Sequence, residues 1–204
     1  MKGLTKVIIL TVIMLIFAQF STYANDIDQF VDGRPQIGVL LEAPLSFCND
    51  SKTNKIVIQK MNLLFPDDKF NVLSLDAGLN AIQVYREEKD MTGLVSNGWT
   101  TYAVPLKKED LISIGNKLNC NYILFMRLSN DMPSYSNGLF TKSAKTTIIC
   151  DVRLLDIAGE NYKYTKQILS KGRSTAIYMG SPSFKRSYYK AFEKALKEVN
   201  DLVI

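Results

Sequence analysis

The part of the sequence that decides the fold is residues 111–129, LISIGNKLNCNYILFMRLS, together with residues 146–162, TTIICDVRLLDIAGENY. In the first stretch, apolar residues recur at helical spacing before Asn119, and residues 122–128 then form an apolar run typical of a buried strand. In the second stretch, apolar residues alternate with others, and residues 158–160 form a turn. This pattern predicts a helix that leads into a central strand, followed by an antiparallel hairpin.

Upstream of these stretches, strands and helices are expected to alternate. Apolar runs predict strands at 37–42 and 70–75. A helix capped by one of residues 49–51 should follow the first strand, and a helix capped by Asp76 should follow the second. Strands joined by helical crossovers run parallel to one another.

Downstream of the hairpin turn, residues 162–170 should pair back as its second strand. Ser181-Pro182 then matches the start of a helix, and residues 183–202 carry apolar side chains every three or four residues. We therefore expect an α/β (α+β) fold: a single mixed sheet of about five strands, with early strands parallel and a late antiparallel hairpin. The C-terminal helix should pack on this sheet.

The N-terminal residues have the three parts of a secretory signal peptide. Lys2 and Lys6 precede an apolar run that ends at Phe20, and Ala24 offers a cleavage point. The alternative is an uncleaved anchor helix, but the run is shorter than the roughly 20 apolar residues that span a bilayer. We expect residues 1–24 to be a signal peptide, residues 25–35 a polar tether and residues 36–204 one α/β domain, with no transmembrane segment after cleavage.

Composition excludes most catalytic sites. The chain has no histidine, which removes Ser-His-Asp and Cys-His nucleophiles and every zinc site that needs imidazole. Ser187 and Lys190 match Ser-x-x-Lys, but the elements that should follow in penicillin-recognising enzymes are missing. The acidic pairs at 67–68, 87–88 and 109–110 are adjacent in sequence, so they do not face each other across a cleft. We predict no catalytic, cofactor-binding or metal-binding residues.

The remaining composition is ordinary for an exported protein. Loss of Lys2 and Lys6 would lower the formal charge of +5 by two, and the lysines are spread along the chain, so no nucleic-acid partner is expected. Of the three cysteines, Cys120 and Cys150 are expected to be buried free thiols; if a bridge forms, these two are the expected pair.

Two long segments, 92–104 and 130–140, show no helical or strand pattern, and we expect them to be loops that carry the working surface. Their aromatic residues must either pack beneath the loops or be exposed for a partner. We expect Trp99 to be packed beneath its loop and Tyr102 and Tyr135 to be exposed. The candidate interaction residues are Trp99, Tyr102, Tyr135 and Phe140.

The order of elements from Leu106 to Ile204 resembles a known group of bacterial envelope proteins. The helix LISIGNKLN, the strand CNYILFMRLS, the closing helix SFKRSYYKAFEKALKEV, and Arg153-Leu154-Leu155-Asp156 followed by Gly159 carry the resemblance. This order of elements is similar to the fold shared by the N-terminal domain of TolB, the curli secretion protein CsgG and the activator LpoB. CsgG and LpoB are lipoproteins, whereas no cysteine follows the cleavage point expected here, so we expect no lipid anchor at that position. The resemblance implies a partner-binding role in the cell envelope without a catalytic motif.

From these features we predict a non-enzymatic protein that is exported to the periplasm or the extracellular space. It should bind a protein partner or a component of the cell envelope, without a cofactor. The alternative is a secreted hydrolase with an unfamiliar carboxylate site, which would show a deep pocket with clustered, pKa-shifted acids.

Overall fold

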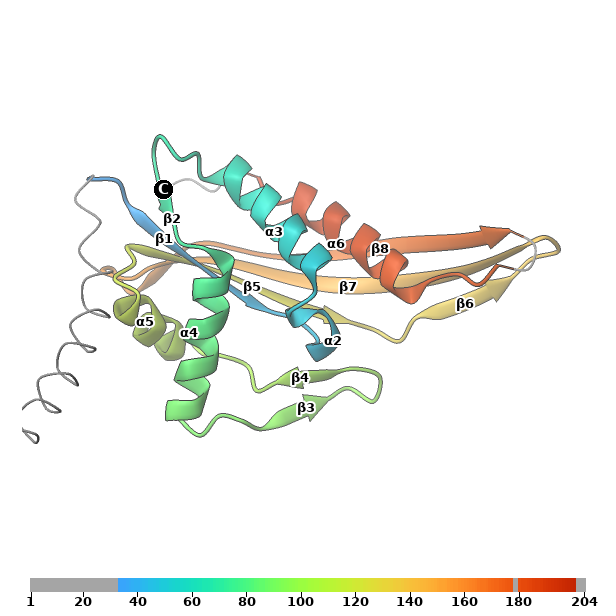
Figure 1. The fold of residues 1–204 in the computed structure, drawn as a ribbon, viewed down its shortest axis with the longest axis horizontal. Helices are drawn as coiled ribbons and strands as arrows, with labels where there is room; N and C mark the ends of the chain where they lie inside the picture. Colours follow the sequence, from blue (N-terminus) through green and yellow to red (C-terminus); the bar gives the residue numbers. More distant parts are fainter. Residues whose placement is uncertain (1–32, 178–179, 201–204) are drawn as a thin grey trace, which may run out of the picture. The chain divides into compact units, whose positions relative to one another are not determined.

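The computed structural model describes residues 33–177 and 180–200 (Figure 1). The predicted signal peptide and residues 25–32 of the predicted tether lie outside the described residues. The contacts divide the chain into Met1–Arg34 and the compact unit Pro35–Ile204, and the architecture below is that of the second unit.

Six strands form one mixed sheet, in the order β2-β1-β5-β7-β6, with β8 paired to β7. The strands are β1 Gln36–Glu42, β2 Asn71–Val72, β5 Tyr122–Asn130, β6 Ser134–Asn137, β7 Thr141–Asp156 and β8 Asn161–Ile177. Strand β1 runs parallel to both β2 and β5, whereas β5, β6 and β8 all run antiparallel to β7. This arrangement confirms the predicted mixed sheet with its late antiparallel hairpin.

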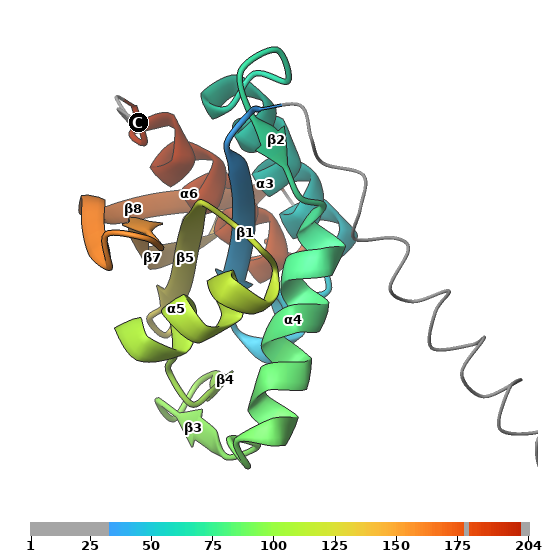
Figure 2. The ribbon, with the colours of Figure 1, turned by 90° about the vertical axis from the view of Figure 1, so that its left-hand side faces the viewer.

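Helices cover both faces of the sheet, as the end-on view in Figure 2 shows. The helices are α2 Leu45–Cys48, α3 Ser51–Leu64, α4 Leu75–Glu88, α5 Lys108–Lys117 and α6 Phe184–Lys197. One apolar cluster joins α3 and α6 to one face, through residues such as Val57, Phe192 and Cys150. A second cluster joins α4 and α5 to the other face, through residues such as Ile82 and Ile114.

Helix α6 approaches β8 unusually closely, at Gly172. A Cβ atom at this position would lie 1.9 Å from the carbonyl oxygen of Ser187. The buried hydroxyls of Thr146 on β7 and Ser187 on α6 are hydrogen-bonded at 2.5 Å. Small residues on the strands therefore let the helix backbone come close, and the prediction that the C-terminal helix packs on the sheet is confirmed.

Several predicted local features are wrong. The segments expected to be loops contain strands: β3 Leu94–Ser96 and β4 Thr101–Ala103 form a separate hairpin, and β6 joins the main sheet. Helix α4 is capped by Ser74, whose hydroxyl accepts a hydrogen bond from the Ala77 N–H at 3.2 Å, and not by Asp76. Helix α6 is capped by Ser183, and not by Ser181 as the Ser181-Pro182 pair predicts.

Candidate functional site

A cavity of about 480 Å³ opens at the carboxyl ends of the parallel strands β1 and β5. In sheets with parallel strands this is the usual place for a ligand. Side chains from both strands, from α2 and α4 and from the β3–β4 hairpin line the cavity. The residues that line this cavity are therefore the candidates for catalytic chemistry.

A buried ion pair dominates the charge of this cavity. Glu42, the last residue of β1, is bonded to the Arg86 guanidinium of α4, and Arg127 Nε of β5 lies 3.8 Å from its other oxygen. Burial raises the pKa of Glu42 above its usual value, and the two guanidinium groups oppose that shift. The Arg86 guanidinium also donates to the Val104 carbonyl at 2.6 Å, which ties α4 to the chain after β4.

This geometry favours a structural role for Glu42. Hydrolysis by two carboxylates needs one acid as proton donor and another as base or nucleophile across the cleft. The other carboxylates that line the cavity, Asp76 and Glu87, are exposed on α4, and Glu42 is already paired with Arg86. The predicted clustering of pKa-shifted acids for a hydrolase is not found among the residues that line the cavity.

The Ser-x-x-Lys match does not form a nucleophile. Ser187 is fully buried and its hydroxyl donates to the Phe184 carbonyl at 2.8 Å, beneath α6. Lys190 is exposed. Since a substrate cannot reach Ser187, the match reflects the packing of α6.

The cysteines are free, and burial raises the pKa of all three thiols, to about 11 at Cys120 and to about 12 at Cys150. Cys120 belongs to the cluster on the α5 face and Cys150 to the cluster on the α6 face, so they are separated by the sheet and form no bridge. Within residues 33–177 and 180–200, no group of three or more His, Cys, Asp or Glu side chains is placed to hold a metal ion.

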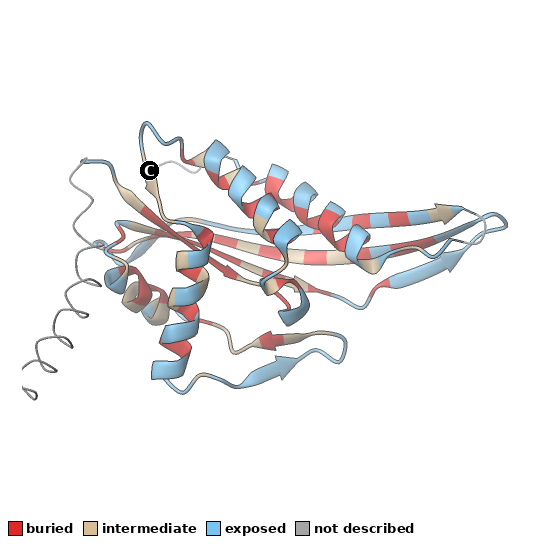
Figure 3. Cartoon of the chain, viewed as in Figure 1, coloured by how far each residue is buried: buried red, intermediate tan, exposed pale blue. Residues whose placement is uncertain are grey.

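The most unusual surface lies at the far end of the long antiparallel strands. We call residues 132–147 and 170–177 the arm; they comprise β6, the start of β7 and the end of β8. In Figure 1 these strand ends extend to the right, past the start of α6, and in Figure 3 much of this region is coloured as exposed. The arm is therefore in contact with solvent over much of its surface.

Large apolar side chains are exposed at the end of the arm. Leu139, in the turn between β6 and β7, is 91% exposed, and its neighbour Phe140 is 63% exposed. Ile177 is 64% exposed and pairs with Thr141, directly after that turn. These three residues form what we call the tip. Exposed apolar groups gathered at one end of a domain gain further burial free energy when another surface covers them.

The four predicted interaction residues divide between the arm and the β3–β4 hairpin. Tyr135 on β6 is exposed, as predicted, and Phe140 belongs to the tip. The prediction for Tyr102 is wrong: its ring is buried, and its hydroxyl accepts a hydrogen bond from the Asn130 N–H at 3.0 Å. The prediction for Trp99 is also wrong, because its side chain is 41% exposed, with its ring edge-on to Phe184 at 6.0 Å.

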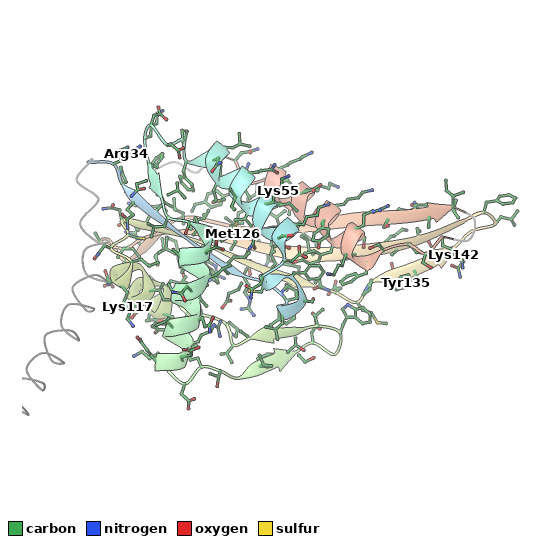
Figure 4. The ribbon with its side chains drawn as sticks, in the orientation of Figure 1. Arg34, Lys55, Lys117, Met126, Tyr135 and Lys142 are labelled. Atoms are coloured by element: carbon green, nitrogen blue, oxygen red, sulfur yellow. The ribbon has the colours of Figure 1, made fainter. Side chains whose placement is uncertain are left out.

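The arm also carries concentrated positive charge. Lys142, Lys145, Lys171 and Arg173 are exposed on it. Lys145 and Arg173 lie directly opposite each other on β7 and β8, and among the described residues none of these four cations takes part in an ion pair. Figure 4 labels Tyr135 and Lys142 on the arm, well away from Lys117 on α5.

Sequence reasoning missed Leu139, Ile177 and the opposed cations. One signal was available, since Leu139 precedes Phe140 in a short polar segment. The pairing of Lys145 with Arg173 depends on strand register, which the sequence pattern did not reveal. Glu42 and Arg86 were missed because the two residues lie 44 positions apart in the chain.

No protein-family model matches the chain, and no curated protein matches it. Solved structures do match. The hypothetical protein CT253 of Chlamydia trachomatis aligns at 10% identity and a TM-score of 0.40, over 82% of this chain and 94% of that chain. The lipoprotein GNA1162 of Neisseria meningitidis aligns at 11% identity and a TM-score of 0.37, over 73% and 88%.

The C-terminal domain of LpoB from Escherichia coli aligns at 11% identity and a TM-score of 0.31, over 72% of this chain and 92% of that chain. LpoB is one of the proteins that the sequence was expected to resemble, and the match is a similarity only. At this identity it says nothing of a partner or an activity.

Proposed function

We propose that this chain is an exported, non-catalytic binding protein of the cell envelope and that the arm carries its binding surface. The observation that supports the proposal is the gathering of Leu139, Phe140 and Ile177 at the tip. Full burial of a large apolar side chain is worth about 1.5–3 kcal/mol, and the three tip residues, which are 63–91% exposed, forgo part of that free energy. A partner that covers the tip recovers that free energy.

The packing of the domain supports the same proposal. The two apolar clusters on the sheet hold the helices, and the tip belongs to neither of them. Helix α6 anchors the inner part of β7 and β8 through the Thr146–Ser187 hydrogen bond. The arm continues β7 and β8 beyond this anchor, so a partner can cover the tip without displacing α6.

A pull-down with envelope extract tests this function. The bait carrying Leu139→Ser and Ile177→Ser should lose at least tenfold in the amount of its captured component, because two apolar anchors that together contribute about 1.4 kcal/mol or more change the affinity at least tenfold. The matched control is Leu63→Ser, since Leu63 is 78% exposed on α3. Equal capture by wild type and both variants would refute the proposal.

A secreted hydrolase is the second candidate, and only the cavity around Glu42 favours it. Its test is the Glu42→Gln variant, assayed against glycoside and ester substrates together with wild type. Turnover by wild type that falls at least a hundredfold in this variant would support hydrolysis. Because Glu42 is paired with Arg86, and we propose that this pair stabilises the fold, we expect no turnover by either protein.

A further inference from the structure

We infer that the arm docks on a bilayer surface that contains anionic phospholipids, with the apolar tip at the boundary between the headgroups and the acyl chains. This inference rests on the proposed function and names the class of its partner. Three features of the arm carry it: the absence of acidic residues from the parts of the strands that form it, a pair of directly opposed cations, and the spacing between those cations and the apolar tip.

The first feature is the distribution of charge along the chain. The sequence has 25 lysines and arginines and 20 acids, yet no acid occurs in residues 132–150 or 161–192. These two stretches include all of β6, all of β8 and the first part of β7. Asp131 lies at the base of the arm, where its N–H donates to the Thr147 carbonyl at 3.1 Å. A surface of this composition attracts anions and repels cationic partners.

The second feature is the direct opposition of Lys145 and Arg173. Residues opposite each other on antiparallel strands have Cα atoms only about 4.5–5.5 Å apart, and like charges in such positions repel. Thr147 and Lys171 form the next pair on the same face, so a third cation lies close by. The described residues supply no acid that pairs with any of these three. An external anion between Lys145 and Arg173 relieves the repulsion.

The third feature is the spacing between these cations and the tip. Ile177 and Arg173 point to the same face of β8, since side chains alternate along a strand. Four residues of strand span about 13 Å. A tip inserted by about 5–10 Å reaches the acyl boundary, which leaves Arg173 and Lys145 level with the phosphate groups. Lys142, one residue after the Thr141–Ile177 pair, has a stem long enough to extend its ammonium group back to the headgroups.

This combination favours a lipid surface over a protein partner. A protein groove would enclose the tip, whereas cations set behind an exposed apolar end match the layered order of acyl chains and phosphates in a bilayer. No described helix is long and apolar enough to cross a membrane, so in this inference the arm contacts the surface and does not span it.

Vesicle co-sedimentation tests the inference. Every protein is purified in the form that the expressing cell exports, so that any contribution of residues 1–34 is common to all of them. Wild type should bind vesicles of phosphatidylcholine with 30% phosphatidylglycerol at least tenfold more tightly than vesicles of phosphatidylcholine alone. High salt should reduce that difference, because it screens the charges.

Two variants separate the roles of charge and apolar surface. Lys145→Gln with Arg173→Gln should weaken binding to the anionic vesicles by about fivefold for each charge removed. Leu139→Ser with Ile177→Ser should weaken binding to both kinds of vesicle. Lys55→Gln with Lys69→Gln is the matched charge control, because both lysines are exposed away from the arm, and it should bind as wild type.

The possible outcomes distinguish a failure of the lipid inference from a failure of the proposed function. If vesicles fail to bind wild type, or bind the charge variant as well as wild type, the lipid inference is wrong. If the envelope pull-down still depends on the tip in that case, a protein partner binds the arm and the proposed function stands. If the tip variant changes neither assay, both are wrong. A wild-type dimer that the tip variant converts to monomer would make a second copy of this chain the occupant, and would also overturn the lipid inference.

Discussion

Replacing Gly172 with alanine tests the close contact between α6 and β8 at the base of the arm. The added Cβ atom would lie 1.9 Å from the Ser187 carbonyl oxygen and 2.6 Å from the Ala191 nitrogen. Both contacts are with the helix backbone, so no change of rotamer relieves them. Ordinary contact begins at 3.4 Å, so α6 has to move away from β8 by about 1.5 Å, which is the difference between 3.4 and 1.9 Å.

The expected cost follows from three contributions. Overpacking costs about 1–3 kcal/mol, and the Thr146–Ser187 hydrogen bond contributes about 0.5–1.5 kcal/mol that the shift would remove. Alanine offsets part of this, because it loses about 0.5–1 kcal/mol less backbone entropy than glycine. We expect a net loss of about 2 kcal/mol in the free energy of unfolding, which corresponds to a fall in Tm of about 4–8 °C.

Urea unfolding followed by circular dichroism measures this loss. Gly93→Ala is the matched control, since its Cβ would meet only the Val104 side chain at 3.4 Å. It should unfold within about 0.5 kcal/mol of wild type. A Gly172→Ala protein as stable as the Gly93→Ala control would show that α6 does not pack against β8 at this position.

Three further predictions concern the buried pair, a helix cap and the thiols. Arg86→Met leaves Glu42 buried without its main partner and should lower the free energy of unfolding by about 3 kcal/mol at pH 7.5. Because the pKa of Glu42 is raised in the folded state, Glu42 binds a proton more readily in the folded protein than in the unfolded protein. The Arg86→Met variant should therefore regain stability as the pH falls from 7.5 towards 5, and unfolding experiments at several pH values in that range check the direction of the change. Ser74→Ala should lower the free energy of unfolding by about 1 kcal/mol, and Asp76→Ala should lower it much less, as measured by thermal unfolding. A larger loss for Asp76→Ala than for Ser74→Ala would show that Asp76 caps the helix. In the absence of reductant, a thiol reagent should detect three free thiols in the unfolded protein. In the folded protein, Cys150 should resist alkylation at pH 8, because burial raises its pKa to about 12.

The central fold could be predicted from the sequence because its elements bury apolar residues at regular intervals. The alternation around Cys150 and the helical spacing after Phe184 each specify one buried face. The arm could not be predicted in this way. There, β7 and β8 alternate exposed residues with small ones such as Ala144, Gly172 and Ser174, which leave room for α6 but give no apolar signal.

The candidate surface was only half predictable, for two physical reasons. Tyr102 is buried because its hydroxyl bonds to Asn130, which is 28 residues away, and local sequence cannot reveal such a partner. The opposition of Lys145 and Arg173 depends on a register shift between β7 and β8 near Leu154. Because a shift of one residue reassigns every cross-strand pair beyond it, a single irregularity decides which charges face each other.

Site-specific photo-crosslinking in cells that export the protein tests most directly whether the arm is the binding surface. A photoreactive residue replaces Leu139 at the tip in one strain and Leu63 on α3 in the other; both positions are strongly exposed, at 91% and 78%. The proposal predicts that position 139 crosslinks to lipid or to another envelope component and that position 63 does not. Equal crosslinking from the two positions, or crosslinking from position 63 alone, would contradict it.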